Sequence, residues 1–214
     1  MARVRDISWR ATALGVFLTA CALAGARPAA ALTYTAIDLH PSGFTDSVAY
    51  GVGGGQQVGE GFMSNFSEHA LLWTGTAASV VDLNPSGFTG SRALGASGGQ
   101  QVGYGLGPDH ALLWTGTAAT AVDLNPSGFD ISAAFGVAGG QQVGWGFLHA
   151  TGAEHALLWS GTAASVVDLH PSGFTESEAF GVAGGQQVGD GRGLLRAATS
   201  TPSSGRARPR APWT

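Results

Sequence analysis

The chain has 214 residues, of which 44% are apolar and 11% are charged, a composition that excludes an intrinsically disordered protein and allows a packed core. All ten basic residues are arginines, and only Arg92 lies between residues 32 and 190, where thirteen of the fourteen acidic residues are found. Because such an acidic body repels phosphate groups, the charge distribution excludes nucleic acid as a partner.

Residues 1–31 have the layout of a secretory signal peptide. A basic segment, "MARVRDISWR", precedes an apolar run over residues 11–26, and alanines at 29–31 supply the small residues of a cleavage site before Leu32. The apolar run is too short for a good membrane span, so we expect no transmembrane span in the mature chain. The segment "LTAC" at 18–21 allows an alternative, in which Cys21 is lipidated and anchors the protein. Both interpretations predict export, to a secreted or extracellular location.

The body of the chain is repetitive. "GGQQVG" begins at residues 54, 98, 139 and 184, so the repeat period is 41–45 residues. A glycine-rich phosphate loop occurs once per nucleotide and opens a helix, whereas these four copies are followed by neither GK[ST] nor a helical pattern. The period therefore indicates a repeat architecture rather than a nucleotide site.

Each unit predicts four short strands. "HALLW" is a continuous apolar run that suits a strand covered on both faces, "SVVDL" is rich in β-branched residues, and "SxAxGV" and "QQVGxG" are joined by a glycine pair. "TGTAA" is a tight connection, and "NPSG" has the residues of a type I turn beginning at the asparagine. Four strands in this period predict an all-β, β-propeller-like array of four-stranded repeats over residues 32–190.

The array is expected to be open. "HALLW" occurs three times, beginning at His69, His110 and His155, which is fewer than the ~4 blades of the smallest common propellers. We therefore expect an incomplete or open array of about four units, whose free sheet edges favour self-association.

The order "HALLW…VDL…SxAxG…GQQVG" resembles the HAF repeat of bacterial extracellular proteins, and the resemblance covers residues 32–190. The chain departs from the usual pattern because Leu71, Leu112 and Leu157 replace a phenylalanine, "NPSGF" replaces a glycine-rich turn, and the asparagine of "GIN" is missing. The resemblance implies export and a β-rich repeat, and it implies no catalytic residues.

Several repeated residues could carry chemistry, but their repetition favours a structural role. An aspartate follows each "HALLW" histidine at the same interval, which gives the pairs His69–Asp82, His110–Asp123 and His155–Asp168. Catalysis needs one asymmetric site with differentiated roles, so we predict no catalytic residue, metal ligand or cofactor here.

Two further motifs have a plain and a functional interpretation. "DLNPSG" at 82–87 resembles the opening of a calcium loop, but Ala93 occupies the twelfth position, where a glutamate is needed, so a plain turn is favoured. The tryptophans Trp73, Trp114 and Trp159 could stack on sugars, but one buried tryptophan per unit is their ordinary use in a core.

The segments that break the repeat are the predicted partner-binding site. They cover residues 60–68, 104–109 and 145–154, and we expect them to be loops on one face of successive units. Apolar side chains on exposed loops favour a partner surface, although they could instead pack over the sheet edges. The candidate residues are Phe62, Met63, Phe66, Tyr104, Trp145, Phe147 and His149.

Residues 191–214 do not continue the repeat, and their arginines and prolines predict a disordered tail. Codons that encode this tail can encode "EHALLWTGTAAxxVD" when they are read two bases out of register, so we infer a frameshift near residues 190–198.

The predicted function is that of an exported, non-enzymatic scaffold or binding module for an unknown extracellular or cell-surface ligand. The alternative is a propeller-type carbohydrate-active enzyme or lectin. Such an enzyme needs paired carboxylates outside the repeat positions, and acids such as Asp46, Glu60 and Asp130 are scattered over different units.

Overall fold

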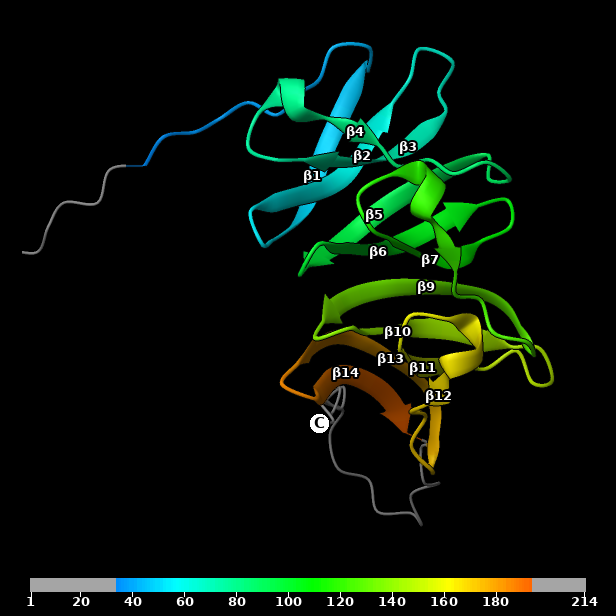
Figure 1. Cartoon of the computed structure of the whole chain (residues 1–214). Coiled ribbons are helices and arrows are strands. Elements are labelled where there is room, and N and C mark those ends of the chain that lie inside the picture. The colour runs from blue at the N-terminus through cyan, green and yellow to red at the C-terminus, as the bar shows by residue number, and fades with distance from the viewer. Residues whose placement is uncertain (1–33, 194–214) are drawn as a thin grey trace, which may run out of the picture. The chain divides into compact units, whose positions relative to one another are not determined.

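The computed structural model describes residues 34–193, so the predictions for residues 1–31 and for the tail from residue 194 onward lie outside the described residues. The chain divides after Ala36 into two units, and every strand belongs to the second unit, Ile37–Thr214. Fourteen strands form four antiparallel sheets, and residues 34–193 contain no α-helix. The structure confirms the predicted all-β, propeller-like array (Figure 1).

Three sheets have four strands each, and the last has two. Sheet A contains β1 (Asp46–Gly53), β2 (Gln56–Phe62), β3 (Glu68–Trp73) and β4 (Val81–Asp82). Sheet B contains β5 (Gly90–Ser97), β6 (Gln100–Leu106), β7 (His110–Trp114) and β8 (Val122–Asp123). Sheet C contains β9 (Phe129–Ala138), β10 (Gln141–Leu148), β11 (Glu154–Trp159) and β12 (Val167–Asp168). Sheet D contains β13 (Phe174–Ala183) and β14 (Gln186–Gly193).

Strand order within each sheet follows the chain, because short turns join neighbouring strands. The glycine pair between the first two strands has positive φ at both residues, for example 59° at Gly98 and 80° at Gly99, as a two-residue type I′ hairpin requires. The predicted "TGTAA" connection contains a single 3₁₀ turn in each full sheet, at Ala77–Ser79, Ala118–Thr120 and Ala163–Ser165. The predicted "SVVDL" strand is shorter than expected, because only its valine and aspartate pair with "HALLW".

The predicted type I turn at "NPSG" is wrong in its position. The amide of Phe88 donates to the carbonyl of Pro85, so the turn begins at the proline rather than at Asn84. Gly87, at φ 95°, then occupies the third position of the turn, where a type II turn requires positive φ. Asn84 is left free to use its side chain elsewhere.

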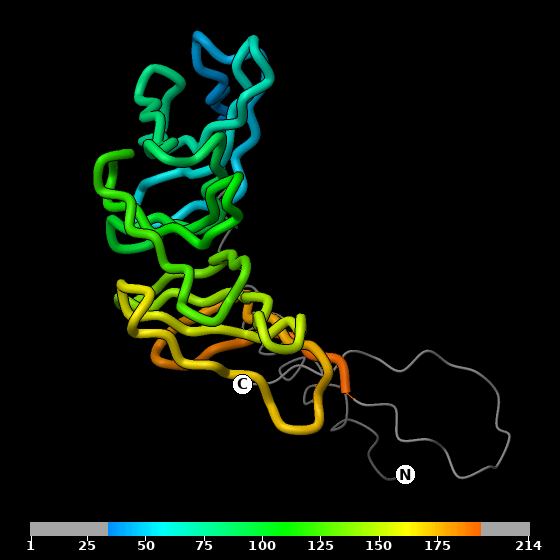
Figure 2. Tube along the Cα trace, turned by 90° about the vertical axis from the view of Figure 1, so that its right-hand side faces the viewer, coloured from blue at the N-terminus to red at the C-terminus, as the bar shows by residue number. Residues whose placement is uncertain are grey.

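The core lies between successive sheets. Val58, Ala70 and Leu72 of sheet A pack against Leu112 and Trp114 of sheet B, and equivalent clusters join sheet B to sheet C and sheet C to sheet D. We call these three interfaces seam 1 (A–B), seam 2 (B–C) and seam 3 (C–D). The four sheets follow one another in chain order, from the blue strands of sheet A to the orange strands of sheet D (Figures 1 and 2).

Close approach across the seams explains a glycine in the first strand of sheets A, B and C. A Cβ atom on Gly95 would lie 2.6 Å from the carbonyl oxygen of Phe135 in the next sheet. Gly51 and Gly136 face the same restriction, whereas a Cβ atom on Gly181 would meet only a side-chain atom of Val188, 3.1 Å away in its own sheet. The first strands of successive sheets therefore pack backbone to backbone.

The array is open, as the sequence predicted. The sheets do not close into a barrel, and within residues 34–193 no strand follows β14 in sheet D. Val188 is 50% exposed, whereas its counterparts Val58, Val102 and Val143 are fully buried. Strand β14 also runs to Gly193, past the predicted boundary at residue 190, because Phe174 pairs with Gly193 and Glu176 pairs with Arg192.

Candidate functional site

The invariant serine of "SxAxG" joins each of sheets B, C and D to the sheet before it. Ser132 Oγ accepts the backbone N–H of Ala111 at 3.0 Å and donates to Asn125 Oδ1 at 2.7 Å. Ser91 makes the same pair of bonds to Ala70 and Asn84. These serines are buried, so their hydroxyl groups are structural parts of the seams.

The residue before each turn proline completes this arrangement as either asparagine or histidine. Asn125 accepts from Ser132 through Oδ1 and donates through Nδ2 to the carbonyl of Phe129 at 3.1 Å. His170 does the same with its ring, because Nδ1 lies 2.8 Å from Ser177 Oγ and Nε2 lies 3.1 Å from the carbonyl oxygen of Phe174. This residue therefore holds the seam together, and neither side chain is free to act as the third ligand of a calcium loop.

The three predicted histidine–aspartate pairs form, and they have identical geometry. Nδ1 of the histidine lies 2.7 Å from Oδ2 of the aspartate in each pair, and Oδ1 of Asp82 accepts the amide of Asn84 at 2.8 Å. Each aspartate thus fixes the chain as it leaves its sheet, which supports the structural interpretation.

The tryptophans and the second glutamine of each "QQVG" also serve the core. Trp73, Trp114 and Trp159 are at most 1% exposed, so no sugar can reach their rings, and the core interpretation is confirmed. Gln101 and Gln142 are fully buried and accept the amides of Gly116 and Gly161, respectively. The residues that repeat are therefore used by the scaffold itself.

Positions that differ between units gather along the seams. At the residue after the invariant serine, sheet B has Arg92, sheet C has Ala133 and sheet D has Glu178. At the residue after "QQVG", the sheets have in turn Glu60, Tyr104, Trp145 and Asp190. An acidic residue precedes each "HALLW" histidine and completes the set: Glu68, Asp109 and Glu154. The three seams therefore carry chemically different side chains at equivalent positions of the same scaffold.

Seam 1 is closed by an ion-pair network. The guanidinium of Arg92 contacts the carboxylates of Glu60 and Glu68, and Tyr50 donates its hydroxyl to Glu60 at 2.5 Å. Burial raises the pKa of Glu60, and the neighbouring Glu68 raises it further. Burial also opposes ionisation of Glu68, but its hydrogen bond with Arg92 lowers the pKa of that carboxyl overall. The Arg92 side chain thereby fills the space between the two sheets.

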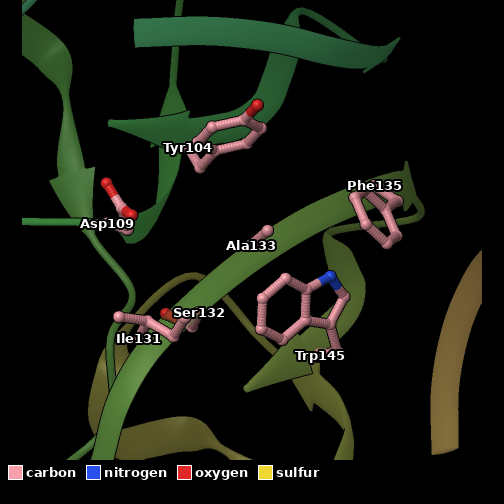
Figure 3. A pocket seen from close by; sticks show the side chains of 7 residues that line it. All are labelled: Tyr104, Asp109, Ile131, Ser132, Ala133, Phe135 and Trp145. Atoms are coloured by element: carbon pink, nitrogen blue, oxygen red, sulfur yellow. The ribbon is translucent and has the colours of Figure 1, made fainter. Parts of the chain in front are cut away.

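Seam 2 has a pocket of about 270 Å³ at the equivalent place (Figure 3). Ala133 occupies the Arg92 position, and its short side chain leaves the space unfilled. In Figure 3 the rings of Tyr104 and Trp145 lie on either side of Ala133, and Phe135 lies further along the same strand. The remaining lining residues are Asp109, Ile131 and Ser132.

The aromatic walls of this pocket are held by contacts outside it. Trp145 packs edge-on against Phe147 with ring centroids 5.1 Å apart, and Phe135 stacks on Phe180 at 5.8 Å. The guanidinium carbon of Arg92 lies 5.9 Å from the Tyr104 ring centroid. The pocket is therefore preorganised by its neighbours rather than formed by free side chains.

Seam 3 is acidic. Its pocket, of about 190 Å³, is lined by Phe147, by four acidic residues and by Arg192, which pairs with Glu176 at 2.9 Å. Burial raises the pKa of Glu154 to about 8, and the hydrogen bond and negative charge of Glu178 add to this shift, with a further contribution from Glu176. The Glu154 carboxyl therefore keeps its proton near neutral pH. The four acidic residues are Glu154, Glu176, Glu178 and Asp190.

The predicted partner-binding residues do not form one loop surface. Four of them lie in strands, not loops: Phe62 in β2, Tyr104 in β6, and Trp145 and Phe147 in β10. The strands extend beyond "QQVG" because the two-residue side-chain alternation continues through the variable residues. Met63 and Phe66 lie in the β2–β3 turn, where the amide of Phe66 donates to the Met63 carbonyl and Phe66 is 88% exposed.

The structure brings only some of these residues together. Tyr104 and Trp145 line the seam 2 pocket, Phe147 lines the seam 3 pocket, and His149 pairs with Asp130 at 2.6 Å on the surface. Sequence reasoning missed Asp109, Phe135 and Ala133 of seam 2, as well as the Glu154–Glu178 pair of seam 3. The available signal was the variation at the residue after the invariant serine.

No family model, curated protein or solved structure matches this chain. Within residues 34–193, no group of three or more histidine, cysteine or acidic residues is arranged to hold a metal ion. No helix of that part of the chain is long and apolar enough to cross a membrane.

Proposed function

We propose that the chain is an exported, non-enzymatic binding module of the HAF-repeat type, and that its ligand binds at the seams. The observation that carries this proposal is that repeated and variable positions of the units have different structural roles. The repeated serine, glutamine, histidine and aspartate side chains bond to the scaffold, while the positions that differ meet at equivalent places between the sheets. Repeat proteins commonly combine a constant core with a variable binding surface in this way.

Seam 2 is the strongest candidate for the binding site. It combines a pocket, three aromatic side chains and one carboxylate, and protein pockets for small ligands are typically apolar with a few polar groups. Seam 1 is filled by Arg92, so it offers no comparable space.

Export is the second part of the proposal and rests on the composition of residues 1–31. Mass spectrometry of the secreted protein is expected to find Leu32 at the mature N-terminus. A diacylated Cys21 in the membrane fraction would instead establish the lipid-anchored alternative, and a cytoplasmic chain that retains Met1 would contradict export altogether.

A carbohydrate-active enzyme remains the second candidate function, because seam 3 contains a specific feature that favours it. A carboxyl group with a pKa of about 8 is protonated at neutral pH and can act as a general acid, as in glycosidases, where a second carboxylate assists it. Glu154 offers such an acid at the seam, and the carboxylate of Glu176 lines the same pocket.

One set of variants separates these functions. Ala133→Arg fills the seam 2 pocket with the side chain that already fills seam 1, and Glu154→Gln removes the acid of seam 3. We expect a panel of sugars, amino acids, organic cations and aromatic acids to contain a ligand that raises the melting temperature of the native chain but not of Ala133→Arg.

The results that contradict the proposal are equally defined. A panel without any stabilising ligand, or a ligand that stabilises Ala133→Arg equally, would show that seam 2 is not a binding site. Hydrolysis of chromogenic glycosides by the native chain, lost in Glu154→Gln but kept in Ala133→Arg, would establish the enzymatic alternative.

A further inference from the structure

The seam 2 pocket has aromatic walls and one negative charge. Tyr104, Phe135 and Trp145 present rings to it, and the carboxylate of Asp109 lies at one side (Figure 3). The faces of aromatic rings carry partial negative charge, so they attract cations within about 6 Å of the ring centroid. The combination of several rings with a carboxylate is suited to a positively charged ligand.

The neighbouring seam shows a cation in the equivalent place. Arg92 projects from the position that Ala133 occupies in sheet C, and its guanidinium contacts Glu68, which is the counterpart of Asp109. The same guanidinium lies 5.9 Å from the centroid of the Tyr104 ring. Seam 2 thus retains the aromatic and acidic groups of a cation site while lacking the internal cation.

The hydrogen-bonding groups of the pocket restrict the kind of cation. The Ser132 hydroxyl is engaged with Ala111 and Asn125, and Asp109 Oδ1 accepts the amide of Gly107 at 3.2 Å. The other polar side-chain groups among the lining residues are the Tyr104 hydroxyl and the Trp145 ring N–H, so Asp109 is the only charged group at the pocket. A sugar or a primary amine carries several O–H or N–H groups, which is more than these few polar groups can satisfy in a mostly apolar pocket. A quaternary ammonium group has no N–H to satisfy, and its methyl groups suit apolar walls.

The charge of the surrounding protein favours the same ligand. Residues 34–193 contain thirteen acidic residues and only two arginines, Arg92 and Arg192, both of which pair with glutamates. The resulting negative potential raises the local concentration of cations.

We propose that the seam 2 pocket binds a quaternary ammonium group, with the rings of Tyr104, Phe135 and Trp145 around the methyl groups and Asp109 as the counter-ion. This inference rests on the proposed function, since it names the ligand class of the same pocket. Choline is the simplest compound that carries this group.

The experiment is isothermal titration calorimetry of the full chain with choline and with 3,3-dimethyl-1-butanol, which has the same shape but no charge. We expect choline to bind at least about tenfold more tightly than the neutral compound, because only choline gains the cation–π and carboxylate interactions. Glycine betaine is expected to bind more weakly than choline, since its carboxylate is repelled by Asp109.

Variants connect the binding to the pocket. Trp145→Leu is expected to weaken choline binding about tenfold, Asp109→Asn about threefold or more, and Ala133→Arg completely. Phe66→Leu is the matched control, because it removes an exposed ring outside the pocket and is expected to leave affinity unchanged. Far-UV circular dichroism is used to check that each variant is folded. If Trp145→Leu does not fold, Ala133→Arg still tests whether choline binds in the pocket.

Vesicles distinguish the two sources of the group. Co-sedimentation with phosphatidylcholine vesicles that free choline reverses would identify a lipid head group, whereas binding of choline alone would identify a free solute, and both support ammonium recognition. Equal binding of the neutral compound, no choline binding, or undiminished choline binding by Ala133→Arg would overturn the inference. The proposed function is tested separately: it is contradicted only when no compound of the panel of sugars, amino acids, organic cations and aromatic acids binds at seam 2.

Discussion

The exchange of Ser132 for alanine tests whether the serine hydroxyls hold the sheets together. Ser132 is 2% exposed, and its hydroxyl makes two hydrogen bonds, one to the amide of Ala111 in sheet B and one to Asn125. A typical internal hydrogen bond contributes about 0.5–1.5 kcal/mol net, and a buried donor left without a partner costs about 1–3 kcal/mol. We therefore expect Ser132→Ala to lower the free energy of unfolding by about 2–3 kcal/mol.

The repeat supplies a matched control. Ser47 holds the same strand position in sheet A, but its hydroxyl contacts only the exposed His40, at 2.9 Å. Ser47→Ala is expected to change the free energy of unfolding by less than about 0.5 kcal/mol, as for other surface substitutions.

Urea denaturation followed by circular dichroism measures both values, and hydrogen exchange of the Ala111 amide reports directly on the lost acceptor. If the two variants differ by less than about 0.5 kcal/mol, or if the Ala111 amide stays fully protected in Ser132→Ala, the serines do not secure the seams.

Three further predictions concern other parts of the array. Gly95→Ala places a methyl group 2.6 Å from the Phe135 carbonyl oxygen and is expected to lower the free energy of unfolding, measured by urea denaturation, by about 1–3 kcal/mol or more. The equivalent Gly181→Ala meets no neighbouring sheet and is expected to lower it clearly less, and equal losses would contradict backbone packing at the seams. Because the pKa of Glu154 is raised, the folded chain holds a proton that the unfolded chain releases above its ordinary pKa of 4.5, so stability is expected to fall as pH rises from about 5 to 8. Glu154→Gln is expected to flatten this part of the profile of melting temperature against pH, and an unchanged profile would refute the raised pKa of Glu154. Val188→Lys is expected to reduce any concentration-dependent association seen by analytical ultracentrifugation, because it adds a charge to the exposed face of sheet D, and association unaffected by the change would exclude that face as the contact.

The parts of the fold that depend on local pattern could be predicted from the sequence. "HALLW" is buried on both faces, the glycine pairs form hairpin turns, and the repeat period matches the sheet period. These features depend only on residues close in the chain, and the three copies of "HALLW" and four copies of the glycine pair reinforce one another.

Features that depend on contacts between units could not be predicted in the same way. The sequence predicts that Asn84 and Asn125 start a plain turn, but each bonds to a serine of the next sheet, and the turn begins at the following proline. The recurrence of a serine seven residues after each asparagine or histidine was the signal present in the sequence. Its meaning depends on knowing that the next strand crosses the seam at that point.

The candidate site shows the same limit. Glu154 and Glu178 belong to different sheets, and their separation in the sequence gives no indication that Glu178 helps to raise the pKa of Glu154. Tyr104 and Trp145 interrupt the repeat, which predicts loops, but both lie in strands. Residues that vary at a fixed repeat position are better interpreted as neighbours across a seam than as independent loops.

The two-residue hairpins have a consequence for how the chain folds. Within each sheet, hydrogen-bonded strands are adjacent in sequence, so a sheet can form without waiting for distant segments to meet, and low contact order of this kind favours rapid folding. A single sheet still leaves an apolar face in water, so the smallest stable nucleus is two neighbouring sheets with one buried seam between them. Folding can then spread from any seam in either direction, and damage at one end of the array removes a sheet without dissolving the others.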